Sequence, residues 1–90
     1  MSLFSNLYEE HLILIQRDTI QNIFGMDIND DGIITNLVEN TPAYNSNIKV
    51  NDQIISVNMT PVSTSEQICN IITKYNSIIF TVKRTTGIWV

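Results

Sequence analysis

Five short stretches of strand-forming residues run along the chain, and only one segment has a clear helical pattern. The stretches are His11–Gln16, Met26–Asn29, Ile33–Val38, Gln53–Asn58 and Ser77–Lys83. Polar residues and single glycines separate them, which is typical of a small sheet domain with tight turns. Thr41–Tyr44 begins with Thr-Pro and predicts a short helical turn. The expected order of elements is therefore β, β, β, α, β, α, β.

The clear helix is predicted over Ser63–Tyr75. Its start carries two capping-box spacings, and its last turn holds a cation where the helix dipole favours one. These features are Ser63 with Glu66, or Thr64 with Gln67, and Lys74 at the end. Ile68 and Ile71 share the face expected to pack on the core. A neighbouring stripe of small and large residues faces either a shallow groove or the same core; it consists of Ser65, Cys69 and Ile72.

The first stretch contains the longest uninterrupted apolar run, Leu12–Ile15. Because this run does not alternate with polar residues, it predicts a strand that is covered on both faces. Its length is far below the ~20 residues that a membrane-spanning helix needs. The N-terminal residues lack the basic region of a signal peptide, so we expect a cytoplasmic location. Partner proteins would bring the domain to the membrane periphery.

Size and charge limit the classes of function. The chain has 90 residues, which is one domain, and its 5 basic and 9 acidic residues give a net charge of −4. Nucleic acids and anionic membranes are disfavoured as partners, because phosphate binding needs clustered positive charge. A single cysteine excludes an intrachain disulfide framework and a Cys-rich zinc site, and favours a reducing compartment.

Catalytic and cofactor motifs are not found in the sequence. The only histidine, His11, and the only cysteine, Cys69, lie on segments that no pattern brings together as a nucleophilic pair. The glycines stand alone, so no loop of the kind that holds phosphates is present. We therefore expect no enzyme activity, no cofactor and no metal site.

One short segment matches a metal-binding motif. Asp27–Gly32 has the first residues of a calcium-binding EF-hand loop, with oxygen ligands at Asp27, Asn29 and Asp31. The bidentate glutamate that should end the loop is replaced by Val38. A polar β-hairpin tip is the principal interpretation, and a calcium-responsive module is the alternative.

A second segment predicts a binding site for an anion. Ile23-Phe24-Gly25-Met26 places a glycine between large apolar residues directly before a strand. A sharp turn there directs successive N–H groups into one concavity, where a carboxylate receives charge-assisted hydrogen bonds. Phe24, Met26 and Ile28 would line an apolar pocket beneath it. The alternative is an ordinary bulge or turn.

Taken together, residues 11–84 resemble a PDZ domain. Ile23-Phe24-Gly25-Met26 stands at the family's carboxylate-binding loop, with Ile23 in place of its first glycine. Ile48–Asn58 is similar to Leu-x-x-Gly-Asp-x-Ile-Leu-x-Val-Asn, with Asn51 in place of the glycine. Asn tolerates the left-handed backbone that this turn needs. The loop spacing looks most like the C-terminal PDZ module of the Mint adaptors and next like a syntenin module. Residues 1–10 would then be an N-terminal flank and 85–90 a tail.

The resemblance implies a mainly β fold with two helices, an α+β class. The fold would be a partly open barrel or sandwich of five to six strands, capped by two α-helices. It also implies a scaffolding or adaptor module without enzyme activity. Its ligands would be the C-terminal peptides of other proteins, membrane-protein tails among them. The peptide adds as a strand between Met26–Asn29 and the helix that starts near Ser65.

The resemblance carries over a set of peptide-binding residues from the loop, the strand and the helix. They are Arg17, Ile23, Phe24, Gly25, Met26, Asp27, Ile28, Asn29, Ser65, Cys69 and Ile72. Arg17 would help to hold the carboxylate. Ser65 stands where the Ser/Thr-selecting subclass has histidine, which predicts an apolar or mixed preference at the third-from-last ligand residue.

The tail of the chain itself has the pattern of such a ligand. Ile88-Trp89-Val90 ends in an apolar residue and has another two positions earlier. Because the termini of this family lie away from the groove, the tail would bind a neighbouring molecule. A different alternative is the substrate-binding PDZ domain of a larger protease or secretion protein.

Overall fold

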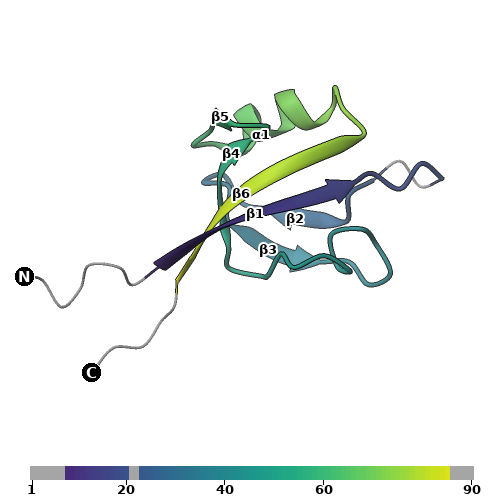
Figure 1. Cartoon of the computed structure of the whole chain (residues 1–90), viewed down its shortest axis with the longest axis horizontal. Coiled ribbons are helices and arrows are strands. Elements are labelled where there is room, and N and C mark those ends of the chain that lie inside the picture. Colours follow the sequence, from purple (N-terminus) through teal and green to yellow (C-terminus); the bar gives the residue numbers. More distant parts are fainter. Residues whose placement is uncertain (1–7, 21–22, 86–90) are drawn as a thin grey trace, which may run out of the picture.

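The computed structural model describes residues 8–20 and 23–85. Within them lie six strands and one helix, shown in Figure 1. They are β1 (Tyr8–Gln16), β2 (Met26–Ile28), β3 (Ile34–Leu37), β4 (Gln53–Val57), β5 (Thr60–Pro61), α1 (Ser65–Ile72) and β6 (Ser77–Thr85). The strands form a four-stranded sheet in the order β1-β6-β4-β5 and a two-stranded sheet of β2 and β3. The fold is thus mostly β. No helix in the described ranges is long and apolar enough to cross a membrane.

β1 and β6 form the longest antiparallel pair, with Tyr8 opposite Thr85 and Gln16 opposite Ser77. Figure 1 shows the two strands side by side along the long axis of the molecule. Since β1 begins at Tyr8, the last three residues of the predicted flank belong to this strand. The rest of that flank and residues 86–90 lie outside the described residues.

Both sheets and the helix contribute to one apolar core. Phe24 and Phe80 meet edge to face, with ring centroids 5.9 Å apart. The other buried apolar residues are Ile13, Ile15, Ile34, Ala43, Ile48, Ile54, Val57, Val62, Ile68, Ile78 and Val82. Ile28, Ile71 and Ile72 are half-buried against it. Ile68 and Ile71 therefore face the core as predicted.

The prediction that β1 is covered on both faces is wrong. Ile13 and Ile15 are buried, whereas Leu12 and Leu14 each leave 62% of their surface exposed. β1 is an antiparallel strand at the edge of its sheet, and such strands pack only one face on the core. The continuous apolar run hides an alternation that only the neighbouring strands reveal.

The expected second helix is not found in the described part of the chain. Thr41–Tyr44 forms a single turn, in which Asn45 N–H donates to the Thr41 carbonyl at 3.0 Å. Ser46 N–H then bonds the Ala43 carbonyl at 3.1 Å in a tighter turn, and the Thr41 and Ser46 hydroxyls donate to the Val38 and Ala43 carbonyls. The turn therefore does not extend into a helix.

α1 is shorter than predicted, although one of the two predicted capping boxes is confirmed. Thr64 and Gln67 form the capping box, and Ser63 lies outside the helix. Thr73 ends the helix, and Lys74 N–H bonds the Ile71 carbonyl at 3.0 Å in a tighter turn. Lys74 thus lies beyond the last helical turn, and its predicted place within that turn is wrong. The short strand β5 has no counterpart in the prediction, because its two residues form no recognisable pattern.

Asparagines take the left-handed turn positions, as the sequence predicts for Asn51. Its φ is 77°, and Asn40 and Asn58 also have positive φ. The loop that contains Asn51 is fixed by Asp52, which is fully buried. Asp52 accepts two hydrogen bonds from the Arg84 guanidinium, at 2.9 and 2.8 Å, and these bonds raise the pKa of Arg84. This pair ties the loop to the end of β6.

Candidate functional site

The loop before β2 turns at Gly25, which only glycine can occupy without strain. Its φ is 97°, and a Cβ there would overlap the side chain of Thr41. The Phe24 carbonyl accepts from Ala43 N–H at 2.8 Å, and the Gly25 carbonyl accepts from Val38 N–H at 2.9 Å. These carbonyls are thus fixed against the 38–43 segment. Within the described residues, the N–H groups of Phe24 and Gly25 donate no hydrogen bond. The loop therefore offers amide donors of the kind that bind an anion.

β2 continues from this loop with an open edge. Val38 N–H donates to the Gly25 carbonyl, and Asn29 N–H donates to the Ile33 carbonyl. Hydrogen-bonded and non-hydrogen-bonded pairs alternate along an antiparallel ladder. The neighbouring pairs Met26–Leu37 and Ile28–Ile34 are therefore non-hydrogen-bonded. The N–H and C=O groups of Met26 and Ile28 consequently point away from β3. No other strand pairs with β2 in the part of the chain that the structure describes.

The helix α1 lies beside this open edge and runs opposite to β2. Ser65 N–H, at the start of α1, donates to the carbonyl of Asp30, just after β2. Ile72, at the end of α1, shares a hollow with the loop before β2. The two contacts place a groove between β2 and α1, with the amide-bearing loop at one end.

The hollow at the loop end of the groove has a volume of about 320 Å³. Its lining combines apolar side chains with one cation and one carboxylate. The residues are Arg17, Ile23, Phe24, Gly25, Met26, Asp27, Val38 and Ile72. All of them except Val38 were predicted as site residues. Val38 follows β3 directly, and its place opposite Gly25 could be found only from the pairing register of the β2–β3 hairpin.

Arg17 connects the loop to the end of α1. Its guanidinium donates to the carbonyl of Ile72 and, at 3.2 Å, to that of Tyr75. The guanidinium carbon also lies 4.5 Å from the centre of the Phe24 ring, within the range of a cation–π contact. Arg17 thus holds α1 against the loop and brings a positive charge to the hollow.

The remaining predicted residues lie farther along the groove or in the hairpin, outside this hollow. Ser65 is half-buried, Cys69 is exposed, and Ile28 packs partly on the core. The Asn29 side-chain oxygen accepts from the N–H groups of Asp31 and Ile33, at 3.0 Å each. Asn29 therefore shapes the hairpin.

The structure around Asp27–Gly32 differs from an EF-hand. The segment joins two antiparallel strands instead of two helices. Asp27 accepts a hydrogen bond from the Asn36 amide at 3.2 Å, across the hairpin. In residues 8–20 and 23–85, no three His, Cys, Asp or Glu side chains gather as a metal-binding group. The polar hairpin tip is the interpretation that the geometry favours.

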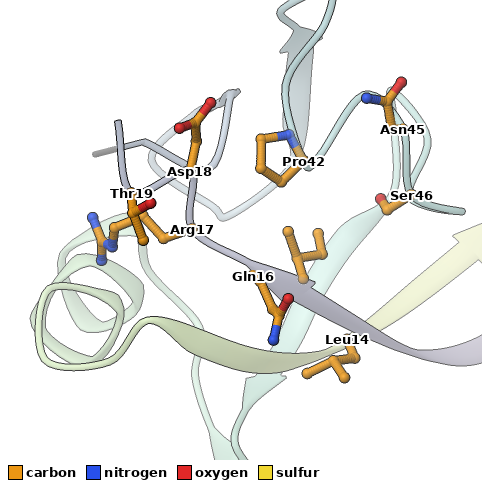
Figure 2. A pocket seen from close by; sticks show the side chains of 9 residues that line it. Leu14, Gln16, Arg17, Asp18, Thr19, Pro42, Asn45 and Ser46 are labelled. Atoms are coloured by element: carbon orange, nitrogen blue, oxygen red, sulfur yellow. The ribbon is translucent and has the colours of Figure 1, made fainter. Parts of the chain in front are cut away.

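A second, larger hollow of about 630 Å³ lies at the end of β1 and was not predicted. Figure 2 shows Pro42, Asn45 and Ser46, on the turn after β3, across from the last residues of β1. Leu14–Thr19 form its other side. This larger hollow is lined by the end of β1 and the turn after β3, whereas the smaller hollow is lined by the amide-bearing loop.

Comparisons with known proteins agree with this geometry. The family model of the PDZ domain matches residues 12–82. A solved structure, the PDZ domain from choanoflagellate SHANK1 bound to a GIRK3 peptide, superposes with a TM-score of 0.74 at 14% identity. The match covers 86% of this chain and 93% of that one. A comparison with curated protein sequences finds no match. The chain, with its glycine-turned loop before β2 and its groove beside α1, belongs to the PDZ domain family.

Proposed function

We propose that this domain is a protein-interaction module that binds the C-terminal peptide of a partner as an added antiparallel strand on β2. PDZ domains are interaction modules rather than enzymes. The observation that carries the proposal is the open edge of β2. Met26 and Ile28 direct their N–H and C=O groups away from β3, two residues apart. An extended peptide has the same two-residue repeat and can pair with both.

The loop before β2 would bind the terminal carboxylate of the peptide. The amides of Phe24 and Gly25 are available as donors among the described residues, and Arg17 brings a positive charge beside them. Hydrogen bonds to a charged group contribute about 1.5–3 kcal/mol each. The carboxylate would therefore fix the register of the bound strand and exclude internal peptide segments.

The last ligand side chain would enter the hollow between the loop and Ile72. Its lining by Phe24, Met26 and Val38 favours an aliphatic residue. Burying a Val, Leu or Ile side chain contributes about 1.5–3 kcal/mol. The third-from-last residue would face Ser65 and Cys69, which offer space without an imidazole acceptor. The preferred ligand thus ends in an apolar residue and has another two positions earlier.

The tail Ile88-Trp89-Val90 fits this preference and would bind the groove of a neighbouring molecule. Such a contact is head-to-tail, so it can extend into chains. The tail lies outside the described residues, and its sequence alone supports this part of the proposal.

The decisive experiment compares two fluorescent peptides that end in Ile-Trp-Val, one with a free carboxylate and one amidated. Loss of charge-assisted hydrogen bonds should weaken binding of the amidated peptide about 10- to 100-fold. Fluorescence anisotropy measures both affinities under the same conditions. Equal affinity would overturn the role of the loop.

A further inference from the structure

The molecule has a second open strand edge, on β1. Arg17 N–H donates to the Asn76 carbonyl at 2.6 Å, which continues the β1–β6 ladder by one residue. N–H and C=O groups of alternate residues point in opposite directions along an antiparallel strand. The backbone groups of the even-numbered residues therefore point away from β6. These residues are Tyr8, Glu10, Leu12, Leu14 and Gln16.

This edge lacks most of the features that protect a strand edge. Edge strands are commonly short, bulged, or interrupted by proline or by charged side chains, lysine above all. β1 is nine residues long, contains no proline or lysine, and pairs with β6 without a register shift. Its two carboxylates, Glu9 and Glu10, lie near its start, and the apolar run Leu12–Ile15 contains no charged residue. No strand covers its outer edge in the described portion of the chain. Leu12 and Leu14 also expose most of their side chains beside it.

We propose that β1 pairs antiparallel with β1 of a second copy, about a two-fold axis at Ile13. Leu12 of each copy then lies directly opposite Leu14 of the other, so four exposed leucines form one apolar cluster. Glu10 lies opposite Gln16, and Glu9 opposite Arg17. The contact is isologous, since the same surface serves on both copies, and it closes as a dimer.

The charge pattern selects this register over its neighbours. In a symmetric pair of strands, the residue numbers of two opposed residues add up to twice the residue number at the axis. A register that keeps the buried faces on the same side moves the axis by one residue and this sum by two. An axis at Leu12 would place Glu10 opposite Leu14. An axis at Leu14 would place Glu10 opposite Asp18, so that two carboxylates face each other. Of these three registers, only the axis at Ile13 pairs all the leucines with one another and places Glu9 and Glu10 opposite Arg17 and Gln16.

The larger hollow leaves space for the incoming strand. It follows Leu14–Thr19 on the outer side of β1, and the 42–46 turn bounds it. With the axis at Ile13, the segment that enters it is Tyr8–Glu10 of the second copy. Glu9 of that segment meets a lining that includes the polar side chains of Asn45 and Ser46. The eight-stranded sheet that results joins two domains and leaves the β2 groove of each one open.

One strand pair buries less surface than the ~1,200 Å² of a stable specific complex, so we expect a weak dimer with a Kd in the micromolar to millimolar range. Sedimentation velocity over a range of protein concentrations measures it. Leu12→Lys places a charge in the leucine cluster and should shift the monomer–dimer midpoint at least tenfold. Met59→Lys, which alters an apolar side chain that is 68% exposed at a distant turn, is the matched control and should leave the midpoint unchanged.

Association through the C-terminal tail would respond differently. A saturating Ile-Trp-Val peptide should dissolve head-to-tail contacts and leave the β1 dimer intact. A protein that stays monomeric at about 1 mM, the weak limit for a specific pair, overturns the proposal. Dissociation by the peptide overturns it as well.

Cysteine cross-linking tests the register itself, in a Cys69→Ser background. Directly opposed residues have Cα atoms about 5.5 Å apart, within disulfide range. A mixture of the Leu12→Cys and Leu14→Cys proteins should therefore form a mixed dimer under mild oxidation. Either protein alone places its two cysteines about 8–9 Å apart and should cross-link far more slowly. Equal rates in all three samples would contradict the register.

Discussion

The open edges of β2 and β1 offer the same backbone chemistry in different surroundings. Each presents N–H and C=O groups from alternate residues to a partner strand. β2 is three residues long, lies beside α1 and begins at the Gly25 loop. β1 is nine residues long, and no other strand pairs with its outer edge among residues 8–20 and 23–85. We infer that the surroundings of a strand edge, rather than the edge itself, determine what can pair with it.

In the proposed binding mode, the loop before β2 would accept only the terminal carboxylate of a peptide. A peptide that continued past the loop would have no carboxylate to offer the amides of Phe24 and Gly25. At the outer edge of β1, the described residues form no loop of this kind, so selection would depend on the side-chain pattern of the partner strand. A pattern that is complementary to itself, such as Leu12 and Leu14 across a two-fold axis, favours a second copy.

The largest effect is expected from Gly25→Ala, which changes the β2 edge alone. The alanine Cβ would overlap Thr41 and the backbone would be strained at a φ of 97°. We expect the free energy of unfolding to fall by about 2–4 kcal/mol and peptide affinity to fall more than tenfold. Thermal unfolding and peptide anisotropy measure the two effects.

Gly32→Ala is the control for Gly25→Ala. Gly32 also has a positive φ, 79°, but its added Cβ meets the flexible end of the Ile68 side chain and lies outside the amide-bearing loop. It should lower stability while leaving peptide affinity within about twofold, because the carboxylate donors are unchanged. Similar losses of affinity in both variants would show that the loop has no special role.

An intermediate effect is expected from Leu14→Pro, which changes the β1 edge alone. The N–H of Leu14 points away from β6, so proline removes a donor from the open edge and none from the β1–β6 ladder. The monomer–dimer midpoint should shift about tenfold while peptide affinity stays constant. Circular dichroism checks the fold. An unchanged monomer–dimer midpoint would show that the protein does not self-associate through the β1 edge.

The sequence predicts the elements that depend on local chemistry. The loop at Gly25 and the left-handed turn at Asn51 are examples, because a backbone conformation there requires a particular residue type. The contact that makes Gly25 irreplaceable comes from Thr41, sixteen residues away, and no local pattern reveals it. Val38 is missed for the same reason, since its position depends on strand register.

The exposed face of β1 illustrates a different limit. Leu12–Ile15 is apolar at every position, so the sequence gives no alternation to follow. The buried face is decided by β6, whose Ile78, Phe80 and Val82 lie on the core side. The prediction that both faces of β1 are covered was wrong because an apolar run shows only that its residues can be buried. Which face is buried depends on the elements that pack against the strand. In this protein, the same excess of apolar residues is the basis of the proposed dimer.

The smallest effect is expected from Ser65→His, which leaves both edges intact and changes only ligand choice at the β2 groove. An imidazole at the start of α1 supplies a hydrogen-bond partner for a hydroxyl on the third-from-last ligand residue. One such bond contributes about 0.5–1.5 kcal/mol, so preference for Thr over Val at that position should rise about 2- to 10-fold. A library of free C-terminal peptides measures the profile, with Ser65→Leu as a control that adds bulk without a hydrogen-bonding group. If the histidine variant kept the original profile, Ser65 would not face that ligand position, and the specificity of the β2 groove would have to come from Cys69 and the rest of its walls.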